Sequence, residues 1–141
     1  MVYLLDVNVL LAFFDPLHFH HEPAHEWFQS IGRKHWATCP ITENGFIRIA
    51  SRSAYPNRPG DASRVLETFR QFLEQPAHIF WPDSKSILEM LKPGVTIHSS
   101  HVTDVYLLGL AVANGGKLAT FDRKIPVQAV VDGEKAIEWL E

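Results

Sequence analysis

The sequence is poor in the features that mark secreted, zinc-stabilised and membrane proteins. It holds a single cysteine, Cys39, in 141 residues, so it forms no internal disulfide and lacks the cysteine partners of a structural zinc site. No apolar run approaches the ~18 residues that a membrane-spanning helix requires. The N-terminal segment carries Asp6 where a signal peptide has basic residues. We therefore expect a cytoplasmic protein with no membrane partner.

An excess of positive charge is also missing. The chain has 13 Lys and Arg against 16 Asp and Glu, a formal net charge of −3. Proteins that bind nucleic acid over a broad surface are usually basic, so the charge balance argues against that kind of binder. It leaves open a nucleic-acid enzyme whose acids are gathered in one place, and the positions of the acids matter more than their sum.

The apolar pattern predicts one α/β domain over residues 1–141. Apolar residues make up 46% of the chain, which is typical of a globular protein. Short apolar runs predict strands at 2–5, 35–39, 77–81, 117–120 and 127–131. Helical spacing and capping residues predict helices at 9–14, 23–31, 40–49, 61 or 63 to 73, 84–91, 103–113 and 134–140. Strands that alternate with helices indicate a parallel sheet covered on both faces, and therefore three layers.

Four acids occupy positions where such a sheet binds ligands, which is outside the carboxyl ends of its strands. Asp6 and Asp122 each follow directly on an expected strand, whereas Glu43 and Asp104 lie in the first turns of expected helices. Each position has an ordinary structural explanation, because acids cap helices and complement the helix dipole. The set is therefore more informative than any one member.

Asp104 fits that ordinary explanation least well. Nearly every residue from 105 to 112 is apolar, so the helix is expected to be buried, and an unpaired buried charge is costly. If the four carboxylates converge, their repulsion calls for a hard divalent cation such as Mg²⁺ or Mn²⁺. Acids at strand ends and hard-metal chemistry together indicate phosphodiester hydrolysis.

Four segments in order resemble the successive motifs of PIN-domain ribonucleases, in particular the VapC toxins of prokaryotic toxin–antitoxin pairs. They are VYLLDVNVLL (2–11), ITENGFIRI (41–49), TDVYLLGLA (103–111) and LATFDR (118–123). The resemblance extends from residue 2 to about 131. It implies a PIN-like α/β/α domain with four to five parallel strands, and an Mg²⁺- or Mn²⁺-dependent endoribonuclease. The metal would be held by the acids that match Asp6, Glu43, Asp104 and Asp122.

The resemblance also assigns supporting roles and partners. Asn8 and Thr120 match polar residues that orient the metal ligands, and turn chemistry or β-propensity explains them equally well. Some family members carry a further acid after the residue that matches Asp122, but here Arg123 and Lys124 follow, and both are candidates for holding RNA phosphates. The family implies an antitoxin partner and a homodimer. All RNAs present the same phosphodiester, and we expect transfer or ribosomal RNA as substrate.

Several other interpretations remain at this point. The chain could be a PIN-like interaction module without catalysis, or a haloacid-dehalogenase-type phosphatase, although Asn8 replaces that family's second acid. An HExxH pattern begins at His21, but Pro23 is expected to start the helix, which leaves His21 outside it and argues against a zinc protease. Arg48 could pair with an acid or contact RNA. The helical aromatics at positions 13, 14, 27, 28, 69 and 72 are expected in the core, with part of the set open to a partner.

Overall fold

A computed structural model describes all 141 residues as one parallel sheet between two helical layers. The strand order is β3-β2-β1-β4-β5, and every neighbouring pair is parallel. The strands are β1 (Tyr3–Leu5), β2 (Trp36–Thr38), β3 (His78–Phe80), β4 (Lys117–Thr120) and β5 (Ile137–Trp139). The α-helices are α1 (Val7–Phe14), α2 (His21–Ser30), α3 (Pro40–Ala50), α4 (Ala62–Leu73) and α5 (Val102–Ala113). The predicted α/β fold with a parallel sheet is confirmed.

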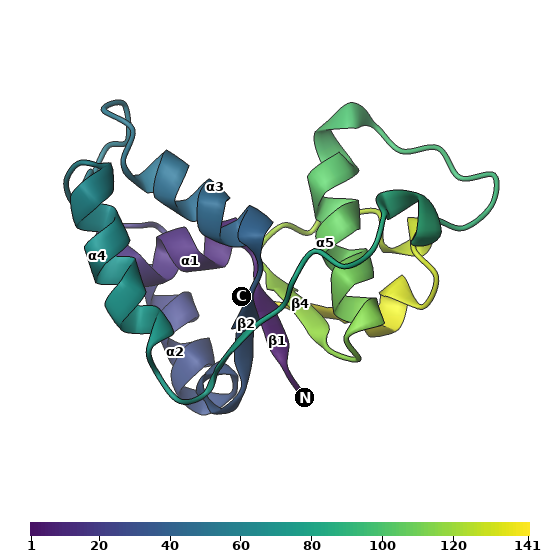
Figure 1. Ribbon diagram of the computed structural model, residues 1–141, viewed down its shortest axis with the longest axis horizontal. Helices are drawn as coiled ribbons and strands as arrows, with labels where there is room; N and C mark the ends of the chain where they lie inside the picture. Colours follow the sequence, from purple (N-terminus) through teal and green to yellow (C-terminus); the bar gives the residue numbers. More distant parts are fainter.

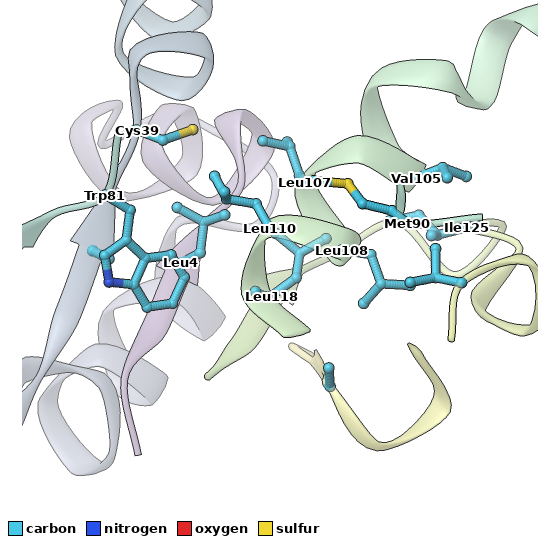
Figure 2. Packing of buried hydrophobic residues seen from close by; sticks show 14 residues of the cluster. Leu4, Cys39, Trp81, Met90, Val105, Leu107, Leu108, Leu110, Leu118 and Ile125 are labelled. Carbon is cyan, nitrogen blue, oxygen red and sulfur yellow. The ribbon is translucent and has the colours of Figure 1, made fainter. Parts of the chain in front are cut away.

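The helices divide between the two faces of the sheet. Helices α1 to α4 lie on one side of the strands, and α5 lies on the other together with the C-terminal segments (Figure 1). Successive strand residues point to opposite faces, so Leu4 joins the cluster around α5, whereas Leu5 joins the cluster around α1 and α4. Figure 2 shows the cluster around α5, in which Leu4 of β1 and Leu118 of β4 lie beside Leu110 of α5. No helix has both the length and the apolar character to cross a membrane.

The C-terminal segment differs from the prediction. The expected strand 127–131 is a 3₁₀ helix (Val127–Ala129), and Val130 forms an isolated antiparallel bridge with Leu91. The expected helix 134–140 contains instead the 3₁₀ turn Gly133–Lys135 and strand β5. Short apolar runs do not distinguish a strand from another buried segment, and β5 forms because Ile137 lies beside Leu118 of β4.

One further expected helix is much shorter than predicted. Residues 84–91 form only a 3₁₀ turn (Ile87–Glu89), which Ser86 and Glu89 cap reciprocally. The segment then continues to Met90, whose side chain is buried in the cluster around α5. Ile87, Met90 and Leu91 therefore pack on the core from a connecting segment, whereas Leu88 is exposed, and the segment forms no helical stripe.

Candidate active site

Asp6 lies at the centre of the carboxyl edge of the sheet. It follows β1 directly and caps α1, because its Oδ1 accepts a hydrogen bond of 2.7 Å from the backbone N–H of Val7. Its Oδ2 accepts a 2.8 Å hydrogen bond from the hydroxyl of Thr120, the last residue of the adjacent strand β4. Asp6 is only 5% exposed. The pairing of β1 with β4 therefore fixes the position of a buried carboxylate.

Asn8 and Thr120 join the two strand ends into one hydrogen-bonded unit. The amide of Asn8 donates to Thr120 Oγ1 at 3.1 Å, and its Oδ1 accepts from the backbone N–H of Phe121 at 3.2 Å. The backbone N–H of Asp122 donates to the same Thr120 oxygen at 3.0 Å. Thr120 thus contacts both Asp6 and the backbone of Asp122, and Asn8 closes the unit.

Asp104, in the first turn of α5, lies close enough to Asp6 to affect the ionisation of that carboxyl. Burial raises the pKa of the Asp6 carboxyl to about 6, and the negative charges of Asp104 and Asp122 add to this effect, while the Thr120 hydrogen bond opposes it. Burial and the charge of Asp122 likewise raise the pKa of Asp104, against the opposing effect of His101. Three acids from three elements therefore repel one another at this edge.

A cleft of about 460 Å³ opens in front of Asp6 and Asp104. One wall is made by these two acids with Thr103, and the other by α3, which contributes Asn44 and Arg48. Arg48 is exposed and pairs with no carboxylate, because the ion pairs of the protein are those of Arg70 with Glu67 and Glu74. The cleft thus places a free guanidinium opposite a group of carboxylates.

Glu43, the fourth predicted metal ligand, makes its contacts apart from the three aspartates. Its carboxylate accepts a 2.6 Å hydrogen bond from Thr38, whose hydroxyl also contacts Nε2 of His78 at 2.7 Å. Glu43 lines a separate groove of about 400 Å³ between α3 and α4. With 3.6 residues per helical turn, the face of α3 that presents Asn44 and Arg48 to the cleft excludes Glu43.

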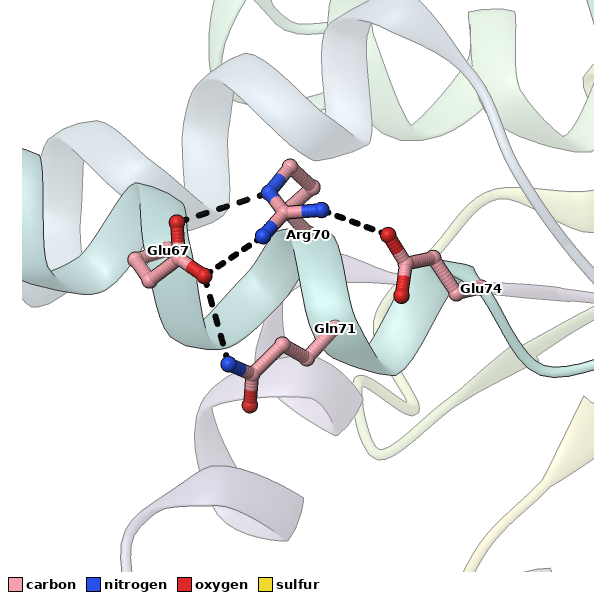
Figure 3. A network of polar contacts seen from close by, with 4 residues as sticks. All are labelled: Glu67, Arg70, Gln71 and Glu74. Atoms are coloured by element: carbon pink, nitrogen blue, oxygen red, sulfur yellow. Dashed lines mark hydrogen bonds and ion pairs between the residues drawn. The ribbon is translucent and has the colours of Figure 1, made fainter.

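The groove between α3 and α4 also holds the protein's only ion pairs. Arg70 bridges Glu67 and Glu74 along α4, and Gln71 donates to Glu67 (Figure 3). These side chains are more than half exposed, and exposed pairs contribute little to stability. They neutralise Arg70 locally, so this groove does not offer the free positive charge that Arg48 offers in the cleft.

The carboxylate oxygens of the aspartates fit a hard cation that is also bound by water and by substrate phosphates. All the side-chain donors are carboxylate oxygens, which Mg²⁺ and Mn²⁺ prefer. No group of three His, Cys, Asp or Glu side chains is arranged to enclose an ion. Mg²⁺ is usually bound by one or two carboxylates together with water and substrate phosphates, and not by an all-protein cage. The open arrangement around Asp6 and Asp104 has that character.

Arg123 and Lys124 follow Asp122 directly, beyond the carboxyl end of β4. The guanidinium of Arg123 stacks over the ring of Trp139 at 5.5 Å. The backbone N–H of Lys124 donates to Asp122 Oδ1 at 2.9 Å, which restrains that carboxylate. Both side chains are exposed, so their charges are accessible to a ligand at this edge.

The HExxH pattern does not form a metal site, although the reason differs from the expected one. Helix α2 begins at His21, so the expectation that His21 lies before the helix is wrong. The ring of His21 hydrogen-bonds the carbonyl of Ala12 at 2.8 Å, and His25 stacks on Phe13 at 4.5 Å. Both rings are therefore engaged in packing α2 against α1.

The aromatic residues of the helices belong to the core. Trp27, Phe28, Phe69 and Phe72 are buried, and the neighbouring phenylalanines of α1 pack against them. The most exposed aromatic ring is that of Phe19, which is 90% exposed in the segment between α1 and α2. Sequence reasoning missed Phe19, and it also missed Asn44, which helical spacing places one turn before Arg48 on the cleft face of α3.

Comparisons with known proteins find one matching family model, similar sequences and a similar solved structure. The PIN domain family model matches residues 3–131. The chain is 40% identical to ribonuclease VapC44 of Mycobacterium tuberculosis over 134 residues, which cover 94% of each chain. It is 37% identical to ribonuclease VapC39 of the same organism over 124 residues, covering 86% of this chain and 89% of the relative. The solved structure of VapBC2 from Rickettsia felis, bound to a DNA fragment from their promoter, covers both chains fully with a TM-score of 0.62 and 16% identity.

Proposed function

Because the chain belongs to the PIN-domain family and to its VapC ribonucleases, we propose that it is a metal-dependent endoribonuclease toxin that hydrolyses RNA phosphodiester bonds at the cleft in front of Asp6 and Asp104. The observation that carries this proposal is the group of three carboxylates at the carboxyl edge of the sheet, where burial and mutual repulsion raise the pKa of Asp6 to about 6. Such a group favours the binding of a hard cation and its phosphate ligand.

Asp6, Asp104 and Asp122 are the proposed holders of Mg²⁺ or Mn²⁺. When bound, such an ion acidifies a water molecule and stabilises charge on the scissile phosphate. Asp6 is positioned for this role because Val7 and Thr120 hold both of its oxygens. Glu43 is left out of the proposed set, because its carboxylate would have to leave Thr38 and reach the opposite face of α3.

The RNA backbone is proposed to run between the aspartates and α3. Arg48 offers an unpaired guanidinium in the cleft, which suits a phosphate because its planar fork can donate two parallel hydrogen bonds. Arg123 and Lys124 beyond the carboxyl end of β4 are proposed to contact flanking phosphates. These contacts position RNA without reading its sequence, so we expect transfer or ribosomal RNA to be selected by its shape.

The remaining parts of the proposal concern partners. A VapBC complex is among the solved structures to which this fold is similar, which supports a cognate VapB-like antitoxin that covers the cleft and holds the toxin inactive. We also propose a homodimer, which the family assignment supports. We place the protein in the cytoplasm, where its RNA substrate is found.

The test compares RNA cleavage by the wild type, Asp104→Asn and Asp61→Asn in Mg²⁺. Asp61 caps α4 away from the cleft, and asparagine is an equally good cap, so Asp61→Asn controls for the loss of one negative charge. We expect Asp104→Asn to abolish cleavage and growth arrest while Asp61→Asn retains both. Equal cleavage by all three proteins would reject the proposal, and a wild type that binds antitoxin but never cleaves RNA would favour an inactive module.

A further inference from the structure

An exposed aromatic ring stands beside the proposed active site. Phe19 is 90% exposed, the highest value among the large apolar side chains of the protein. It lies in the short segment that joins α1 to α2. A phenyl ring left in water forgoes the favourable free energy of burial, so its exposure is unfavourable for the isolated protein.

The segment that carries Phe19 is tied down at both ends. Asp15 is buried, and its carboxylate accepts hydrogen bonds from the backbone N–H of Leu17 at 3.0 Å, from Tyr55 at 2.8 Å and from Asn57 at 2.9 Å. The backbone N–H of residue 20 donates to Nδ1 of His18 at 3.0 Å. These bonds define an ordered turn, so the turn itself presents the ring to solvent.

Phe19 is the outer member of a row of three rings. Its ring meets that of His20 edge to face, with centroids 4.9 Å apart and planes at 86°. His20 stacks nearly parallel on Phe121, with a centroid distance of 4.4 Å and an interplanar angle of 14°. The row therefore runs from open solvent to the end of β4.

The inner end of this row adjoins the carboxylates. Phe121 lies between Thr120 and Asp122 in the chain, and neighbouring Cα atoms are about 3.8 Å apart. Its backbone N–H donates to Asn8, whose amide contacts the Thr120 hydroxyl that holds Asp6. The aromatic row and the acidic group are thus parts of one hydrogen-bonded structure.

We propose that Phe19 and His20 form a stacking site for an unpaired RNA base that flanks the scissile phosphate. This proposal rests on the proposed ribonuclease function and narrows its substrate to single-stranded or loop RNA. Unpaired bases stack on aromatic side chains, whereas the bases of an A-form duplex are stacked on one another and offer no free face. With a net charge of −3, the protein lacks a broad basic surface, and stacking supplies affinity that charge does not.

The experiment uses the full-length protein and a hairpin RNA whose loop contains 2-aminopurine in place of one adenine. Phe19→Ala and His20→Ala remove the rings, and Phe19→Tyr restores a flat ring. Leu17→Ala is the matched control, because Leu17 is 77% exposed in the same segment but has no ring. Cleavage rate, antitoxin binding and 2-aminopurine fluorescence are measured for each protein, with circular dichroism as the check on folding.

We expect the wild type, Phe19→Tyr and Leu17→Ala to quench the 2-aminopurine fluorescence and to cleave the hairpin at similar rates. Phe19→Ala is expected to lose the quenching and to bind the hairpin about 10-fold more weakly, since base stacking on one aromatic side chain is worth that much or more. His20→Ala is expected to give the same direction of change, because it removes the ring that supports Phe19.

Two outcomes would overturn the stacking site while leaving the ribonuclease function intact. One is a Phe19→Ala protein that quenches and cleaves like the wild type. The other is a loss of antitoxin binding in both Phe19→Ala and Leu17→Ala with RNA cleavage unchanged, which would assign the surface to a protein partner. Failure of the wild type to cleave RNA would instead reject the proposed function, and the fluorescence measurement would then decide the stacking site by itself.

Discussion

Replacing Asp6 with asparagine is expected to stabilise the metal-free protein while it abolishes RNA cleavage. Asp6 is 5% exposed, and Asp104 and Asp122 add their repulsion to the cost of its burial. An ionised carboxylate is therefore unfavourable at this position unless it binds a cation. Removing the charge is therefore expected to stabilise the folded state when no metal is present.

The size of the effect follows from the pKa of Asp6. A rise from 3.8 to about 6 makes the ionised carboxylate cost the fold about 3 kcal/mol at neutral pH. The amide of asparagine keeps one acceptor oxygen for Val7 but gives a poorer partner for the Thr120 hydroxyl, which costs about 1 to 2 kcal/mol. The expected net gain is about 1 to 2 kcal/mol, or a rise in Tm of a few °C for a domain of this size.

The sign of the pH dependence provides an internal control. Because the folded-state pKa of Asp6 lies above its unfolded value, this group makes the wild type lose stability as pH rises from about 4 to 6. The advantage of Asp6→Asn should therefore be absent near pH 4 and complete above about pH 7. Urea unfolding in EDTA at pH 4 and pH 7.5 measures both limits.

Mg²⁺ should reverse the order of the two proteins. An ion present at 100 times its Kd stabilises the fold by about 2.7 kcal/mol, and the wild type should gain this while Asp6→Asn should not. Asp61→Asn, which changes the same charge at an exposed cap, should follow the wild type throughout. An Asp6→Asn protein that is less stable than the wild type at pH 7.5 in EDTA would refute the reasoning.

Three other changes have definite expected outcomes. Arg48→Gln should weaken RNA binding for all sequences and should lower the salt dependence of the RNA affinity by about one released counterion. Arg52→Gln, outside the cleft, should change neither quantity. Filter binding at several salt concentrations measures both. Asp15→Ala should cost about 2 kcal/mol in urea unfolding, because Tyr55 and Asn57 lose their acceptor. Although burial raises the pKa of Asp15, its hydrogen bonds lower it overall, so its contribution should fall away below about pH 4. Glu43→Gln should keep the stabilisation by Mg²⁺ that Asp104→Asn loses in calorimetry; loss in both would place Glu43 among the ligands.

The strand and helix pattern near the site was predictable from local sequence. The apolar run before Asp6 and the run before Asp122 form β1 and β4, and the apolar stretch after Asp104 forms α5. In a parallel sheet, carboxyl ends share one edge, so the convergence of these three aspartates followed from their positions after strands and at a helix start. The net charge of −3 was likewise compatible with an enzyme that gathers its acids.

The C-terminal region was not predictable in this way. Residues 127–131 and 137–139 are both short and apolar, and periodicity does not distinguish which of them pairs with β4. Strand β5 is decided by the register of Leu118 with Ile137. The failed helix at 134–140 has the same origin, because pairing with the sheet overrides a weak local preference for helix.

The sequence by itself determined the fold class and identified the three aspartates as candidate site residues. Both inferences depend on patterns within a few residues along the chain. Only the tertiary structure decided that Asn44 faces the cleft while Glu43 bonds Thr38, and that Phe19 and His20 extend a row of rings from Phe121. The row of rings depends on contact between segments about a hundred residues apart, as does the hydrogen bond from Thr120 to Asp6. Glu43 and Thr38 are near each other in the chain, but they belong to a helix and a strand whose packing decides the contact. Spacing along the chain carries no information about such contacts until the sheet brings the segments together.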